Sequence, residues 1–138
     1  MITYKDTKTF SAQELETLFN SVGWLSGKYP KQLVKAMQNS STVFSAWDGT
    51  ELAGLVNVLD DSVLTAYIHC LLVSPKYQNI GIGRTLVAKV KEKYKNYLYL
   101  LLMIDDPENR AFYEQYGFTV AESSTPMLIF SPDKVISM

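Results

Sequence analysis

A glycine-containing loop between a strand-like and a helix-like segment constrains the fold most. Residues 63–73 are rich in β-branched and aromatic side chains, as strands are. The loop, residues 78–83, reads Gln-Asn-Ile-Gly-Ile-Gly, and apolar side chains at helical spacing follow it, at Leu86, Val87, Val90 and Tyr94. Residues 97–104 then form an unbroken apolar run, which is typical of a strand covered on both faces. Together these segments predict a βαβ unit with two parallel strands.

The segments before this unit predict antiparallel strands and two helices. Ser11 and Glu14 have the spacing of a capping box, which opens a helix that Gly23 can end. Pro30 suits the first turn of a second helix. An Asp-Gly pair at residues 48–49 is a hairpin signal that joins a strand over residues 42–47 to one over 51–59. Residues 2–4 supply a short first strand.

The segments after the unit predict one more helix and two more strands. Asp106 can cap the helix, with Pro107 at its first position and Gly117 at its end. Residues 118–121 and 127–130 are expected to pair as final strands. The sequence therefore predicts a single α/β domain over residues 1–138. Its central sheet is mixed and mostly antiparallel, with one parallel βαβ crossover and helices on both faces.

Composition excludes several classes of protein. The 138 residues include 13 basic and 14 acidic side chains, and a net charge of −1 argues against general nucleic-acid binding. Cys70 is the only cysteine and His69 the only histidine, so neither a disulfide within the chain nor a zinc-binding cluster is expected. No apolar stretch approaches the ~20 residues that span a bilayer, and residues 1–10 lack a signal-peptide apolar region. We expect a cytoplasmic protein with no metal, no nucleic-acid partner and no membrane association.

The glycine loop by itself leaves several interpretations open. Glycines at a helix start let backbone N–H groups approach a phosphate closely. No Gly-Lys-Ser/Thr follows, which excludes a P-loop. A dinucleotide site fits Asp105 at the end of the next strand, although Leu86 replaces the third glycine of that fingerprint. A tight turn without a ligand also stays open. Six basic side chains against Glu92 alone between Ser74 and Lys95 favour either an anion site or a solvated lysine-rich face.

Two motifs resemble those of a known family. Residues 71–84, Leu-Leu-Val-Ser-Pro-Lys-Tyr-Gln-Asn-Ile-Gly-Ile-Gly-Arg, closely resemble the acetyl-CoA-binding motif of the GNAT family of N-acetyltransferases. Residues 111–118, Ala-Phe-Tyr-Glu-Gln-Tyr-Gly-Phe, resemble the family's second landmark, and the two motifs bracket the apolar run as the family requires. The resemblance covers nearly the whole chain. It implies a GNAT-like fold and transfer of the acetyl group of acetyl-CoA to a primary amine, by direct attack in a ternary complex.

The resemblance also implies which residues hold acetyl-CoA. The backbone of Leu71, Leu72 and Val73 would pair with the pantetheine amides, and an N–H there would polarise the thioester carbonyl. The pyrophosphate would lie at the loop and the helix start, against Gln78, Asn79, Ile80, Gly81, Ile82, Gly83 and Arg84. Asn109 would contact the cofactor from the last helix. The family's more usual asparagine, seven residues before the family's tyrosine, is Asp106 in this chain, which departs from the pattern.

Two residues are candidates for proton transfer. Tyr113 matches the family's general-acid tyrosine, which would protonate the leaving thiolate, and packing at a helix–strand junction is its alternative role. His69 is the candidate base, as in members with a histidine on this strand; others use a glutamate or a bound water, and a packing role also stays open. Regular alternation places the His69 side chain on one strand face with those of Tyr67, Leu71 and Val73. It points Cys70 the other way, and direct transfer leaves that thiol no nucleophilic role.

The acceptor and the assembly state are less constrained. In the family, the connection over residues 22–29 lines the acceptor side, where Trp24 and Tyr29 would form an aromatic wall if they are not core residues. A small-molecule amine, an aminoacyl group and a protein lysine or N-terminus all stay open as acceptors. Family members often form homodimers through C-terminal strands, to which Phe130 could contribute. A coenzyme A-binding regulatory module without turnover is the alternative function, and a nicotinamide- or flavin-binding protein is a third.

Overall fold

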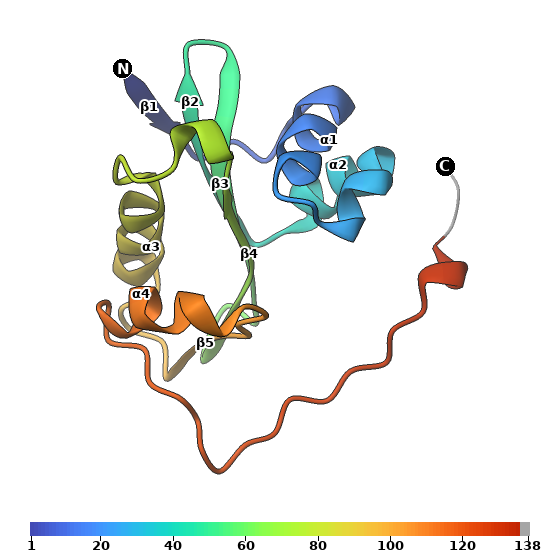
Figure 1. The fold of residues 1–138 in the computed structure, drawn as a ribbon. Coiled ribbons are helices and arrows are strands. Elements are labelled where there is room, and N and C mark those ends of the chain that lie inside the picture. Colours follow the sequence, from blue (N-terminus) through green and yellow to red (C-terminus); the bar gives the residue numbers. More distant parts are fainter. Residues whose placement is uncertain (136–138) are drawn as a thin grey trace. The chain divides into compact units, whose positions relative to one another are not determined.

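The computed structural model describes residues 1–135, and the chain divides into two compact units, of which the first is Met1–Leu102. This unit is built on a five-stranded sheet (Figure 1). The strands lie in chain order, as β1 (Ile2–Lys5), β2 (Thr42–Asp48), β3 (Glu51–Asp60), β4 (Thr65–Val73) and β5 (Tyr99–Leu102). Neighbours are antiparallel except β4 and β5, which are parallel. The mixed, mostly antiparallel sheet with one parallel crossover is thus confirmed.

Three helices of the first unit begin where local signals predict them. Helix α1 (Ala12–Ser21) opens on a capping box, in which Ser11 Oγ accepts from the Glu14 N–H and Glu14 Oε1 accepts from the Ser11 N–H. Helix α2 (Pro30–Asn39) has its proline in the first turn, after the 3₁₀ turn η1 (Leu25–Lys28). Helix α3 (Ile82–Lys93) follows the 3₁₀ turn η2 (Pro75–Tyr77).

Helices cover both faces of the sheet in this unit. Figure 1 shows α1 and α2 on one side of the strands and α3 on the other. On the α1–α2 side, buried side chains form one cluster, whose members are Phe10, Leu15, Leu18, Phe19, Leu33, Met37, Val43, Trp47, Leu52, Leu55, Cys70 and Leu72. Helix α3 buries the four apolar side chains that its spacing predicts, Leu86, Val87, Val90 and Tyr94. Strand β4 is thus packed between α1 and α2 on one face of the sheet and α3 on the other, and this packing sets the position of the loop that follows β4.

The second parallel strand is less buried than the sequence predicts. Among the described residues β5 pairs only with β4, so it is a four-residue strand at the edge of the sheet. Its side chains are also not covered on both faces, as the apolar run predicted they would be. Tyr99 is 58% exposed and Leu101 is 43% exposed. An apolar run shows that a segment avoids polar side chains, but it does not show how many neighbours the segment has.

The second unit, from Met103 onward, contains short helical turns and extended chain. The 3₁₀ turn η3 (Pro107–Asn109) runs into α4 (Arg110–Glu114), and η4 (Pro132–Lys134) lies near the end. Asp106 caps this region as predicted, because its side chain accepts from the Glu108 N–H, and Gly117 adopts a φ of +92° after α4. Residues 103–135 include no strand, however, so the predicted strands at 118–121 and 127–130 are wrong. The four side chains of residues 127–130 are 64–91% exposed, and an apolar segment without a hydrogen-bonded neighbour is not a strand.

Candidate functional site

The glycine loop links the end of β4 to the start of α3 as predicted. Gly81 is the N-cap of α3, and its φ of +93° is a left-handed conformation that glycine adopts without a steric penalty. Asn79 also has a positive φ, +67°, which asparagine tolerates better than most residues. The Gln78 side chain folds back, and its Nε2 donates to the Val73 carbonyl at 3.0 Å. The loop therefore presents the N-terminus of a twelve-residue helix, whose unpaired N–H groups favour an anion.

Beside the loop, the last part of β4 has a neighbouring strand on only one edge among the described residues. Strand β5 pairs with β4 only from Thr65 to Ile68, opposite Tyr99 to Leu102. Residues 70–73 pair with β3 on their other edge, and no described strand pairs with residues 69–73 on the β5 side. Backbone groups of Leu71, Leu72 and Val73 thus belong to an open edge that an extended ligand can extend by hydrogen bonding. The structure brings this edge and the loop together within one unit.

His69 lies on this stretch of β4 at a β-bulge, which the sequence did not predict. Asn57 pairs with Cys70 and Val58 pairs with Ile68, so β4 carries one extra residue, His69. The imidazole is exposed, and its centroid lies 5.8 Å from that of the Tyr67 ring. Burial still alternates residue by residue through the bulge: Ile68, Cys70 and Leu72 are buried, and Tyr67, His69, Leu71 and Val73 are less so, as expected for a shared face. Cys70 packs in the cluster beneath α1 and α2.

Asn57 holds the bulge from the other strand, and sequence reasoning missed it. Its side chain is 1% exposed; Oδ1 accepts from the Cys70 N–H at 3.0 Å, and Nδ2 donates to Ser40 Oγ at 3.1 Å. Ser40 Oγ in turn donates to the Ala36 carbonyl at 2.7 Å. The Asn57 amide replaces the ladder partner that the bulge displaces, and it ties β4 to the end of α2. The signal in the sequence was a single amide within the apolar run of residues 52–59.

Cys70 is not poised as a nucleophile. The side chain is 8% exposed, and burial raises the pKa of its thiol to about 12. Since the thiolate is the reactive form, the thiol is inert in the native protein at neutral pH.

Tyr113 and Asn109 lie in the second unit, which is described by itself. Tyr113 is half-buried on α4, with its ring edge-on to those of Phe112 and Phe118 at centroid distances of 5.1 and 5.9 Å. Burial raises the pKa of its hydroxyl to about 12, so it keeps its proton at neutral pH, as a general acid must. Asn109 ends η3, where its N–H donates to the Asp106 carbonyl, and its side chain is exposed. Asp106 acts here as a helix cap.

Of the two aromatic residues expected on the acceptor side, Trp24 packs edge-on to Phe19 at 5.9 Å and stays 37% exposed, and Tyr29 is half-buried.

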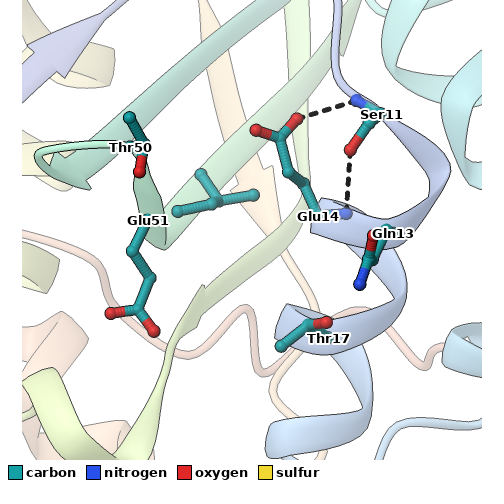
Figure 2. A pocket seen from close by; sticks show the side chains of 7 residues that line it. Ser11, Gln13, Glu14, Thr17, Thr50 and Glu51 are labelled. Atoms are coloured by element: carbon teal, nitrogen blue, oxygen red, sulfur yellow. Dashed lines mark hydrogen bonds between the residues drawn. The ribbon is translucent and has the colours of Figure 1, made fainter.

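A separate pocket of about 170 Å³ lies between the start of α1 and the β2–β3 turn (Figure 2). Figure 2 shows Glu14 turned toward Ser11 and Glu51 on the opposite wall. The capping box occupies Glu14, and Lys76 pairs with Glu51, so neither carboxylate is free for a ligand.

Comparison with known proteins decides the family. The sequence profile described as an acetyltransferase (GNAT) domain matches residues 6–127. The chain belongs to the GNAT acetyltransferases. Within residues 1–135 no helix has the length and apolar character needed to cross a membrane, and no three His, Cys, Asp or Glu side chains gather as a metal centre would require.

Curated relatives and a solved structure agree with GNAT membership. The chain is 29% identical over 122 residues to an uncharacterized N-acetyltransferase ycf52-like protein of Prochlorococcus marinus, covering 85% of this chain and 67% of that one. It is also 29% identical over 119 residues to the uncharacterized N-acetyltransferase ycf52 of Porphyra purpurea, covering 82% and 67%. A GNAT-family acetyltransferase from Streptococcus pneumoniae superposes with a TM-score of 0.81 at 26% identity, covering 96% of this chain and 99% of that chain. This chain thus spans about two thirds of the curated relatives' length.

Proposed function

We propose that this GNAT acetyltransferase binds acetyl-CoA along the open edge of β4 and transfers its acetyl group directly to a primary amine. The observation that carries the proposal is the position of that edge next to an anion-binding helix start, in one compact unit. The edge suits the amides of a pantetheine arm, and the loop suits a diphosphate. A dinucleotide could bind at the loop through its diphosphate, but it has no pantetheine amides to pair with the strand edge.

Each part of the site has a separate task in this proposal. Loop residues 78–84 and the start of α3 would hold the diphosphate, with Gln78 fixed by its bond to Val73. Leu71, Leu72 and Val73 would align the pantetheine arm, and an N–H of this edge would polarise the carbonyl. Acetyl-CoA supplies the acetyl group as an activated thioester. Asn109 stays an expected cofactor contact from the second unit.

Proton transfer is assigned to two side chains. The exposed imidazole of His69 would accept the proton that the attacking amine releases. Tyr113 would give a proton to the leaving thiolate, for which its raised pKa keeps the hydroxyl protonated. With Cys70 buried and protonated, attack by the amine itself is the remaining route.

The first test is calorimetric titration of acetyl-CoA and, separately, of NAD into the purified protein. We expect micromolar binding of acetyl-CoA and no heat with NAD. An amine panel scored by thiol release then separates catalysis from ligand sensing. Binding without thiol release from any amine would favour the regulatory coenzyme A-binding module, and NAD binding instead of acetyl-CoA would overturn the proposal.

Two variants test the assigned roles. Tyr113→Phe should lower kcat about a hundredfold and leave the Kd of acetyl-CoA unchanged, because general acid catalysis contributes that much. Tyr116→Phe, a half-buried tyrosine on the same segment, is the matched control. His69→Gln should remove the acidic limb of the pH–rate profile. An unchanged profile would exclude His69 as the base.

The acceptor, assembly and location belong to the same proposal. A small-molecule or peptide amine is expected as acceptor, with Trp24 and Tyr29 along its path. Light scattering tests whether the chain forms a homodimer, and cell fractionation tests the expected cytoplasmic location.

A further inference from the structure

The segment that leads into the glycine loop is fastened to the β2–β3 hairpin at several points. The Ser74 N–H donates to the Ala53 carbonyl at 2.8 Å. Lys76 Nζ lies 2.8 Å from Glu51 Oε1. The Tyr77 hydroxyl lies within hydrogen-bond reach of both Asp48 Oδ2, at 2.8 Å, and Glu51 Oε2, and its single proton is donated to one of them at a time. Backbone and side-chain attachments thus join residues 74–77 to the tip of a hairpin that is more than twenty residues earlier in the chain.

A second β-bulge shapes the hairpin for these contacts. Ala46 pairs with Gly54 and Trp47 pairs with Leu52, so Ala53 is an extra residue in β3. Its carbonyl is the one that receives the Ser74 N–H. Gly54, the next residue, lets β4 approach closely, because a Cβ there would lie 2.9 Å from the Leu72 carbonyl oxygen. The hairpin tip and the end of β4 are therefore fitted to each other at the level of the backbone.

The two carboxylates at the tip of the β2–β3 hairpin are paired through the contacts with Lys76 and Tyr77. Asp48 and Glu51 are two carboxylates close to a loop that is suited to an anion, and unpaired they would repel a phosphate. The Lys76 ammonium and the Tyr77 hydroxyl bind them, and these contacts hold the pKa of Glu51 below its usual range. Lys76 also lies over the Tyr77 ring, 5.3 Å from its centroid. The two carboxylates thus hold residues 76–77 against the hairpin.

We propose that Asp48, Glu51, Lys76 and Tyr77 form a positioning bracket that holds loop residues 78–83 in their diphosphate-binding conformation before the ligand arrives. The identity of the ligand rests on the proposed function, whereas the bracket itself is a property of the free protein. A loop that is ordered in advance loses less conformational entropy on binding, so the bracket increases affinity without touching the ligand. Tyr77 is the central residue, since its hydroxyl reaches both carboxylates.

The test compares Tyr77→Phe with the native chain in two measurements. Hydrogen exchange of the Tyr77, Gln78 and Thr85 amides, which donate backbone hydrogen bonds at the two ends of the loop, should become at least about fivefold faster in protein without ligand, because hydrogen bonds to carboxylates are among the stronger ones. The Kd of coenzyme A, measured by calorimetry, should rise about tenfold while kcat at saturating acetyl-CoA stays the same. Asp48→Asn, which keeps the shape of the side chain, should show a smaller change in the same direction.

Controls separate the bracket from general damage. Tyr4→Phe removes a tyrosine hydroxyl from β1, on the far edge of the sheet, and should leave both measurements unchanged. Glu51→Gln is the second route if Tyr77→Phe folds poorly, and circular dichroism checks the fold of each variant. Unchanged loop exchange in well-folded Tyr77→Phe and Glu51→Gln would overturn the inference. Faster exchange, with no coenzyme A binding even in the native chain, would support the bracket and instead overturn the proposed function.

Discussion

The two β-bulges of the sheet are held in different ways. The bulge at Ala53 is tied by backbone alone, through its carbonyl and the Ser74 N–H. The bulge at His69 is tied by a buried side chain, because Asn57 supplies the acceptor for the Cys70 N–H. A backbone hydrogen bond does not depend on the side chain at its position, whereas few side chains can replace a buried amide that both donates and accepts. The bulge in β4 therefore depends on the identity of one buried side chain, whereas the bulge at Ala53 is held by a backbone contact.

The largest expected effect concerns Cys70, next to the side-chain-held bulge. Burial raises the pKa of its thiol from 9.0 to about 12, which reduces the thiolate fraction about a thousandfold. Alkylation by iodoacetamide at pH 8 should be slower in the native protein by about that factor than in urea-unfolded protein. Asn57→Ala should make alkylation of the folded protein faster, toward the rate in unfolded protein, by loosening the bulge. Rapid labelling of the folded native chain would contradict the buried position of the thiol.

Asn57→Ala should also destabilise the protein by about 2–3 kcal/mol, because it leaves the buried Cys70 N–H without an acceptor and removes one of the two hydrogen bonds of Ser40 Oγ. Urea unfolding followed by circular dichroism measures the change. Ser40→Ala removes only one end of the network and should cost about 1 kcal/mol. Equal losses in the two variants would show that the bulge does not depend on the Asn57 amide.

Gly54→Ala tests the backbone-held bulge. A Cβ at this position would meet the Leu72 carbonyl oxygen at 2.9 Å and Val73 Cα at 3.3 Å, so strands β3 and β4 must separate slightly. We expect a loss of about 1–2 kcal/mol in the free energy of unfolding, as for other overpacked sites. Faster amide exchange at Ser74, but not at Cys70, would show that the two bulges respond independently.

The smallest expected effect is a pH dependence at the loop entrance. The Lys76 ammonium and then the Tyr77 hydroxyl lower the pKa of the Glu51 carboxyl from 4.5. A lowered pKa in the folded state means that the contact stabilises the protein fully above pH 4.5 and is lost as pH falls through the lowered value. Thermal midpoints of the native chain and of Glu51→Gln should differ slightly at pH 7 and converge as the pH falls below the lowered pKa of Glu51. A difference that persists at low pH would mean that the Glu51 charge is not responsible.

Features set by nearby residues could be predicted from the sequence, and those set by distant partners could not. Ser11 and Glu14, Pro30 and the Asp-Gly turn act within a few residues, and the structure confirms each of them. The glycine loop and its helix were also predictable, since Gly81 acts through its own backbone. Neither bulge interrupts the run of side chains along its strand, because a bulge depends on the register of the neighbouring strand.

The same reasoning explains the errors. Residues 127–130 have the composition of a strand, but a strand also needs a neighbour, and the described residues provide none. For the proposed site, the two family motifs predict roles for the loop, the strand edge and Tyr113, and these roles stay predictions. Asn57 and the bracket residues act through tertiary contacts that no local pattern reveals. Asn57 still left a trace, as a lone amide among apolar neighbours.

The open edge of β4 has a consequence for handling the protein. A row of unpaired backbone groups beside Leu71, Leu72 and Val73 is a template to which any extended chain can add, including a misfolded copy of the same protein. A ligand lying along that edge would hide the template. With coenzyme A as the proposed ligand of this edge, the shelf life of concentrated samples should be longer when coenzyme A is in the buffer.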